Sequence, residues 1–143
     1  YRNTGTGASV VLASQYANEY ILTLDGDLLI HPDDMKRILK YNDENSLACV
    51  LSLAYYAAKK THEIYRELAG GKCVRAFSKE NGRYEWNGIA QLESYKIREG
   101  TGHVFQLLEP WLPIPFLQVR TREIDTKADL DRAEKWIIKG YKD

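Results

Sequence analysis

One stretch decides the fold of this chain, Tyr20-Ile21-Leu22-Thr23-Leu24-Asp25-Gly26-Asp27, in which an apolar run ends in two carboxylates. Such a run is typical of a buried parallel strand, and open α/β sheets bind ligands at the carboxyl edge of their strands. Mg²⁺ takes oxygen ligands and often uses one or two carboxylates together with substrate phosphates. The stretch suggests a Mg²⁺–nucleotide site, but Asp-Gly is also a frequent hairpin signal, so both interpretations stay open.

The composition is that of one ordinary globular domain. The chain has 143 residues, of which 44% are hydrophobic and 28% charged, and its 20 basic and 20 acidic side chains cancel. A neutral balance argues against nucleic acid as a partner. No apolar run approaches the roughly 20 residues that cross a bilayer, so no membrane partner is expected. Cys49 and Cys73 lie in apolar, strand-like runs and are expected to be reduced core residues of a cytoplasmic protein.

Strand-like and helix-like segments alternate along the chain, which predicts an α/β fold with a sheet sandwiched by helices. The segment Ala69-Gly70-Gly71-Lys72 is a hairpin signal, so one antiparallel excursion is expected. Thr126 and Asp129 have the spacing of a capping box that opens the last helix. The predicted strands are Tyr20–Leu24, Leu47–Leu53, Glu63–Leu68, Cys73–Phe77, Tyr84–Leu92 and Phe116–Val119, and the predicted helices are Ala8–Ala17, one from Pro32, Val104–Leu112 and one through Ile138.

Helical spacing also predicts which side chains these helices bury. Met35, Ile38 and Leu39 form the expected inward stripe of the helix that begins at Pro32. For the last helix, the inward stripe is expected to be Leu130, Ala133 and Ile137.

Two carboxylates, Asp27 and Asp125, stand at corresponding points in the chain. Each follows an apolar strand and precedes the polar start of a helix. If the two strand ends meet at one edge of the sheet, the carboxylates are placed to share a cation. Their spacing does not require that they meet, because Asp125 also suits a turn that caps its helix.

The order of four short motifs resembles the nucleotidyltransferases that activate sugar-1-phosphates. The motifs are Gly5-Thr6-Gly7-Ala8, Gly26-Asp27, Trp86-Asn87-Gly88-Ile89, and Glu123-Ile124-Asp125-Thr126 followed by Asp129-Leu130. The closest similarity is to the branch that contains bacterial phosphocholine cytidylyltransferases and related proteins of surface-polysaccharide synthesis. The resemblance implies a Rossmann-like mixed sheet of the nucleotide-diphospho-sugar transferase type.

The resemblance also implies roles for individual residues. Gly5, Thr6 and Asp25 would bind the nucleotide, and Asp27 and Asp125 would hold Mg²⁺ between the reacting phosphates. The acceptor pocket would be lined by Trp86, Asn87 and Gly88, although a Trp in such a strand is more often a core residue. Lys79 would reach the acceptor phosphate, or it is a solvated lysine at a strand end.

The implied reaction is nucleotidyl transfer from a nucleoside triphosphate to a phosphorylated acceptor, a sugar-1-phosphate or phosphocholine, with release of pyrophosphate. Because both reactants are anionic, catalysis would consist mainly of alignment and charge neutralisation. Two alternatives remain open. The stretch Asp25-Gly26-Asp27 also matches the Asp-x-Asp motif of metal-dependent glycosyltransferases, and a related domain can be retained for binding alone. The residues do not identify the base or the acceptor.

The family's Gly-rich loop, which cradles the triphosphate, is absent from the sequence. Residues 1–143 are therefore expected to form the carboxyl-terminal two-thirds of a single nucleotidyltransferase-like domain. Without the missing first strand, the apolar runs Tyr20–Leu24 and Leu47–Leu53 are expected to have an exposed edge or face.

The isolated chain is accordingly expected to self-associate, or to be part of a longer ordered chain, and not to bind a nucleoside triphosphate tightly. Light scattering combined with calorimetric titration of CTP and UTP in the presence of Mg²⁺ tests this expectation. A monodisperse monomer that binds either nucleotide at micromolar concentration would contradict it.

Overall fold

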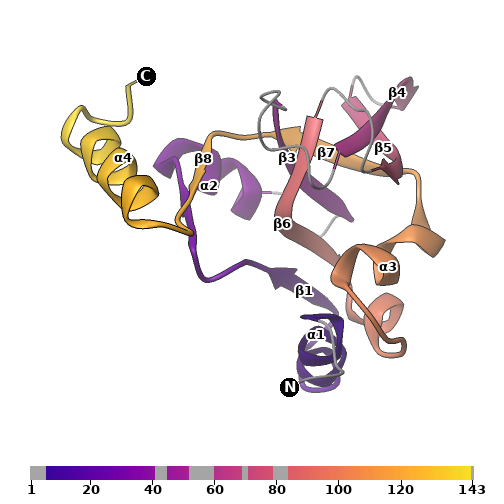
Figure 1. The fold of residues 1–143 in the computed structure, drawn as a ribbon. Helices are drawn as coiled ribbons and strands as arrows, with labels where there is room; N and C mark the ends of the chain where they lie inside the picture. Colours follow the sequence, from indigo (N-terminus) through magenta and orange to yellow (C-terminus); the bar gives the residue numbers. More distant parts are fainter. Residues whose placement is uncertain (1–5, 41–44, 52–59, 69–70, 79–83, 143) are drawn as a thin grey trace.

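The computed structural model describes residues 6–40, 45–51, 60–68, 71–78 and 84–142. Figure 1 shows the helices distributed around a sheet. In chain order, the elements are α1 (Thr6–Ser14), β1 (Tyr20–Thr23), β2 (Leu28–Ile30), α2 (Pro32–Lys40), β3 (Ser46–Leu51), β4 (Lys60–Leu68), β5 (Gly71–Ser78), β6 (Tyr84–Glu93), the 3₁₀-helix η1 (Ser94–Ile97), α3 (Val104–Leu108), the 3₁₀-helix η2 (Glu109–Trp111), β7 (Ile114–Gln118), β8 (Thr121–Glu123) and α4 (Lys127–Ile138).

The main sheet is mixed, as predicted. Its six strands follow the order β1-β6-β3-β7-β5-β4, and β4 also pairs with β6. Among the described strands, β3 and β7 form the parallel pair, and the other pairings are antiparallel. The predicted hairpin is confirmed as β4 and β5, which pair antiparallel from Lys60–Ser78 to Leu68–Gly71. A separate ribbon of two short strands, β2 and β8, stands beside this sheet.

Apolar side chains cover both faces of the main sheet, which confirms the predicted sandwich. On one face, Trp86, Ala90 and Leu92 of β6 belong to a core that includes residues of α1 and α3. On the other face, Ile89 of β6 packs in a second core against Ile38 of α2. Successive strand residues point to opposite faces, so one strand contributes to both cores.

The strand that precedes the acidic stretch differs from its prediction. β1 is not a buried parallel strand, because its residues are only half-buried and it pairs antiparallel with β6. Within the described part of the chain, β1 has no strand on its other side, so its apolar residues receive less cover. The run predicted at Leu47–Leu53 is instead interior: β3 lies between β6 and β7, and the rest of that run lies outside the described residues.

Two helices bury other side chains than the periodicity predicts. In α2, Ile38 is buried and Met35 half-buried, but Leu39 is 52% exposed. In α4, the capping box and the end at Ile138 are confirmed, but Trp136 is buried beside Ala133 and Ile137 is exposed. Ile137 and Trp136 are adjacent and point about 100° apart around the helix axis, and the larger ring of Trp136 occupies the core.

The helix predicted at Val104–Leu112 is shorter than expected. α3 ends at Leu108, and the 3₁₀-turn Glu109–Trp111 follows it. Pro110 explains the change, because proline has no N–H to donate and its ring clashes with a continuing α-helix. The predicted helix at Ala8–Ala17 begins and ends earlier, at Thr6 and Ser14.

Cys73 is buried and free, as expected for a reduced core cysteine. No helix in the described ranges is long and apolar enough to span a membrane.

One buried carboxylate fastens α2 to the ribbon. Asp34, in the first turn of α2, is 2% exposed. It accepts hydrogen bonds from the backbone N–H of Arg120 (2.8 Å), from Nε and Nη2 of Arg120 (2.8 and 3.2 Å) and from Nη1 of Arg37 (3.1 Å). His31 N–H donates to the Arg120 carbonyl at 3.0 Å, so the start of α2 and the entry to β8 are bound to each other twice.

These hydrogen bonds also determine how Asp34 titrates. Burial alone would raise the pKa of Asp34, but the hydrogen bonds from Arg120 and Arg37 outweigh it, so the pKa lies below the ordinary value of 3.8. A lowered pKa means that the folded state favours the carboxylate. The resulting stabilisation is complete above pH 3.8 and is lost as the pH falls through the lower, folded-state pKa.

Replacing Asp34 by Asn should therefore destabilise the protein by about 2 kcal/mol at pH 7, since charged hydrogen bonds are lost. The difference between the two proteins should shrink as the pH falls below 4. Urea unfolding between pH 3 and pH 7 measures it. The control is Asp33→Asn, which removes an exposed partner of Lys36 and should change stability by no more than about 1 kcal/mol. A pH-independent difference for Asp34→Asn would contradict the assignment.

Candidate metal and nucleotide site

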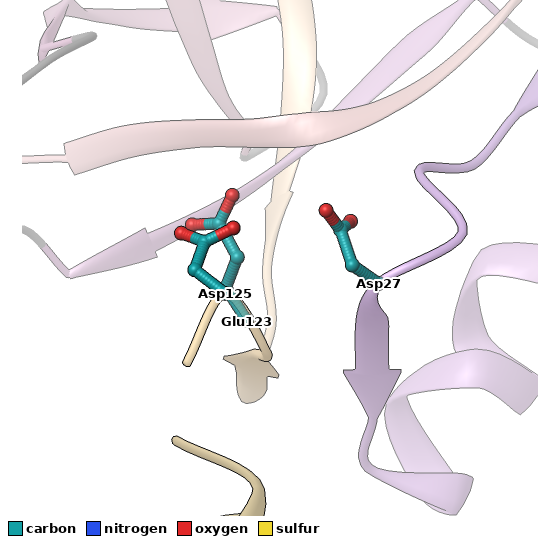
Figure 2. Close-up of side chains that lie close together, drawn as sticks. All are labelled: Asp27, Glu123 and Asp125. Atoms are coloured by element: carbon teal, nitrogen blue, oxygen red, sulfur yellow. The ribbon is translucent and has the colours of Figure 1, made fainter. Parts of the chain in front are cut away.

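Three carboxylates converge beside the ribbon. Asp27 precedes β2, Glu123 ends β8, and Asp125 lies just before α4. One carboxylate oxygen of each lies within 4.8 Å of the other two, and all three side chains are exposed. Figure 2 shows Glu123 and Asp125 side by side, with Asp27 facing them across a gap. The structure thus brings together Asp27 and Asp125, which are far apart in the sequence.

The pairing of β2 with β8 explains this convergence. Leu28 lies opposite Glu123 in the antiparallel register, and Ile30 lies opposite Thr121. One step beyond the register, the Ile124 N–H donates to the carbonyl of Asp27 at 3.0 Å. The three acidic residues therefore lie at the end of the ribbon where both strands open towards solvent.

The donor set suits a hard divalent cation. Three carboxylates so close together repel one another, and a bound cation replaces that repulsion by attraction. All three donors are oxygen atoms, which is the preference of Mg²⁺, Ca²⁺ or Mn²⁺ and differs from the nitrogen and sulfur ligands common in zinc sites. The acidic triad, as Asp27, Glu123 and Asp125 are called below, therefore fits Mg²⁺.

The sequence interpretation assigned no role to Glu123. The signal for it was present in Glu123-Ile124-Asp125, because two acidic residues separated by one residue can act together where a strand ends. The local sequence does not show that β8 pairs with β2, and this pairing brings Glu123 and Asp125 close to Asp27.

Asp25 occupies a different position from the triad. Its carboxylate lies directly over Gly88, where a Cβ atom on residue 88 would come within 2.0 Å of Oδ2 of Asp25. Gly88 has a φ of +87°, which side chains other than glycine rarely adopt. It belongs to a bulge in β6, since the pairing with β3 shifts register between Leu47 and Cys49. The predicted motif glycine thus makes room for an acidic side chain.

The two neighbours of Gly88 in its motif have contrasting surroundings. Trp86 is 3% exposed and belongs to the core, and its Nε1 donates to the Ile89 carbonyl at 2.9 Å. Asn87 is half-buried, and its Nδ2 lies 3.4 Å from Oγ1 of Thr121 in β8. Its Oδ1 is buried without a hydrogen-bond partner among the described residues.

The remaining predicted site residues are only partly described. Thr6 is exposed at the first position of α1, and the glycine after it is buried where the Gly7 N–H donates to the Gly102 carbonyl at 3.0 Å. Gly5 and Lys79 lie outside the described residues.

Comparison with known proteins shows the fold. No family model and no curated protein matches the sequence. Among solved structures, a UDP-glucose pyrophosphorylase complexed with UDP-glucose has a TM-score of 0.75 at 12% identity, covering 98% of this chain and 64% of that one. The inositol-1-phosphate CTP transferase from T. maritima has a TM-score of 0.72 at 15% identity, covering 97% and 62%. HddC from Yersinia pseudotuberculosis, complexed with GMP-PN, has 0.66 at 18%, covering 94% and 63%.

These identities are too low to show more than a shared fold. The predicted resemblance is confirmed at that level, because the neighbours include enzymes named for nucleotidyl transfer to phosphorylated small molecules. The chain spans less than two thirds of the length of each of these structures.

The close contact at Gly88 gives a direct test of the site's geometry. Gly88→Ala should lower stability by about 2 kcal/mol, because alanine is strained at a positive φ, and should displace the Asp25 carboxylate. Thermal unfolding measures the first effect, and a crystal structure of the variant the second. Gly26→Ala is the matched control, since its Cβ would meet nothing within 4 Å. Equal stability of the two variants would contradict the contact.

Proposed function

We propose that this chain, which has the fold of the nucleotidyltransferase structures described above, contributes the cation-binding and acceptor-binding parts of such an enzyme. The reaction is transfer of a nucleotidyl group from a nucleoside triphosphate to a phosphorylated small molecule, a sugar-1-phosphate or phosphocholine, with release of pyrophosphate. The observation that supports this most strongly is the acidic triad, which joins Asp27 to Glu123 and Asp125 across two paired strands.

In this proposal the triad holds Mg²⁺, which when bound neutralises charge on the reacting phosphates and aligns them. The residues of the chain determine where the cation and the phosphates would be held. Asp27 is fixed through its own carbonyl by the Ile124 N–H, so the two sides of the site keep their separation when phosphates arrive. All three side chains are exposed and therefore accessible to substrate.

The nucleotide and the acceptor would lie on either side of this cation. Gly5, Thr6 and Asp25 would bind the nucleotide, and Asn87 and Gly88 would border the acceptor, with Lys79 reaching its phosphate. The position of Asn87 supports this, because the residue is half-buried beside Gly88 and its Nδ2 donates to Oγ1 of Thr121 in β8, the strand that ends in Glu123.

Trp86 takes an indirect part in the proposal. Its indole N–H binds the Ile89 carbonyl and its ring packs on Phe77 at 5.6 Å, so it supports the bulge at Asn87 and Gly88 from inside the core. Because Trp86 is only 3% exposed, its ring would support the acceptor pocket from behind, while Asn87 and Gly88 border it.

The glycosyltransferase alternative is weaker because it would use Asp25 and Asp27 as one Asp-x-Asp pair. The carboxylates of Glu123 and Asp125 each have an oxygen within 4.8 Å of one of Asp27, whereas the Asp25 carboxylate lies over Gly88. The products of the reaction separate the two functions: pyrophosphate is released in nucleotidyl transfer, and a nucleoside diphosphate in glycosyl transfer.

Binding of Mn²⁺, a spectroscopic substitute for Mg²⁺, tests the cation site on the 143-residue chain. Asp27→Asn and Asp125→Asn should each weaken binding about tenfold or more, because even outer-sphere changes at metal sites cost that much, and should leave the melting temperature nearly unchanged. Electron paramagnetic resonance of free Mn²⁺ measures the affinity. Glu134→Gln, at an exposed position of α4, is the control. Absence of saturable Mn²⁺ binding to the unmodified chain would overturn the proposal.

A further inference from the structure

The start of α4 directly follows Asp125 of the acidic triad and is closed by a reciprocal set of hydrogen bonds between Thr126 and Asp129. Thr126 is the N-cap of α4 and directly follows Asp125. Oδ2 of Asp129 accepts from the Thr126 N–H at 2.9 Å and from the Thr126 hydroxyl at 2.6 Å. The Thr126 hydroxyl oxygen in turn accepts from the Asp129 N–H at 3.2 Å. This is a capping box, which satisfies N–H groups that a helix otherwise leaves unpaired.

These hydrogen bonds act on the peptide group next to Asp125. The Thr126 N–H belongs to the peptide group that joins Thr126 to Asp125, so Asp129 fixes the orientation of that peptide. On the other side of Asp125, the Ile124 N–H is bound to the Asp27 carbonyl. Asp125 thus stands between two anchored residues, one bonded to the opposite side of the site and the other to α4.

Helix α4, which carries Asp129, is itself held against β8. At the far end of α4, Trp136 is 3% exposed and the Arg122 guanidinium lies over its ring at 4.5 Å. Arg122 precedes Glu123 in β8, so α4 contacts the neighbours of two triad residues, Arg122 beside Glu123 and Thr126 beside Asp125. In Figure 1, α4 and β8 lie at the end of the molecule away from β4 and β5.

We propose that Asp129 is a positioning residue of the cation site, which holds the Asp125 carboxylate in place through the Thr126 cap. The inference rests on the proposed function, because it takes the triad to be the cation site. The hydrogen bond from the Thr126 side chain lowers the pKa of Asp129, so the cap is in its ionised form at neutral pH. The other oxygen of Asp129, Oδ1, pairs with Arg132 of the next turn of α4.

The test compares two alanine variants of the same helix in the full 143-residue chain. Asp129→Ala removes the cap, whereas Asp131→Ala removes an equal charge whose partner is Lys127 at 2.9 Å on the helix surface. Mn²⁺ binding should weaken about tenfold for Asp129→Ala and stay unchanged for Asp131→Ala. Both are measured well below the melting temperature, with circular dichroism verifying the fold.

A conservative variant separates positioning from folding. Asp129→Glu keeps a carboxylate at the position where capping boxes favour Glu, and it should restore most of the affinity lost in Asp129→Ala. If Asp129→Ala melts at a lower temperature but binds Mn²⁺ as tightly as the unmodified chain, the cap is only structural and the inference is overturned while the proposed function stands. If the unmodified chain fails to bind Mn²⁺, the proposed function fails first and the inference with it.

Discussion

The antiparallel pairing of β2 with β8 is the constraint on which the site depends. It opposes Leu28 to Glu123 and lets the Ile124 N–H reach the carbonyl of Asp27. These residues are far apart in the sequence, so the acidic triad depends on the fold of the whole domain, which brings both strands to one place. No local segment contains it, and loss of this pairing would separate Asp27 from both of its acidic neighbours at once.

A ribbon of two three-residue strands cannot maintain such a pairing alone, because isolated two-stranded structures are marginal in water. Contacts with α2 and α4 supply the stabilisation that the ribbon lacks. Asp34 of α2 binds both the backbone and the side chain of Arg120 as the chain enters β8. Trp136 of α4 packs against Arg122 in the middle of the same strand. The two arginines are thus structural contacts of β8, although a basic residue near an anionic substrate site invites a different interpretation.

The sequence predicted what depends on local pattern and failed where packing decides. Alternation of apolar runs and caps predicted the α/β sandwich, the β4–β5 hairpin and the start of α4 at Thr126, since each follows from neighbouring residues. The predicted inward face of α4 was wrong. Trp136 and Ile137 are adjacent, and only the shape of the available space decides that the Trp136 ring is the one buried. The parallel burial of β1 was also wrong, because the direction of its partner β6 is a property of topology that no strand encodes. For the same reason Glu123 was not grouped with Asp27 and Asp125, whose convergence had been suggested by the two strand ends and by the order of short motifs.

The bulge in β6 shows how the main sheet and the ribbon are joined into one site. A regular strand would place side chains alternately and leave no room for a carboxylate above its backbone. The positive φ of Gly88 breaks that alternation, so Asp25 lies against the bare backbone of residue 88 while Asn87 turns towards Thr121 of β8. Bulges re-aim side chains in this way and are frequent beside functional sites. Gly88 thus lets the segment before Asp27 lie against the main sheet. Asn87 links the same sheet to β8, the strand that ends in Glu123. The missing side chain of Gly88 therefore makes room for the Asp25 carboxylate two residues before Asp27, and the pairing of β2 with β8 brings Asp27 itself to Glu123 and Asp125.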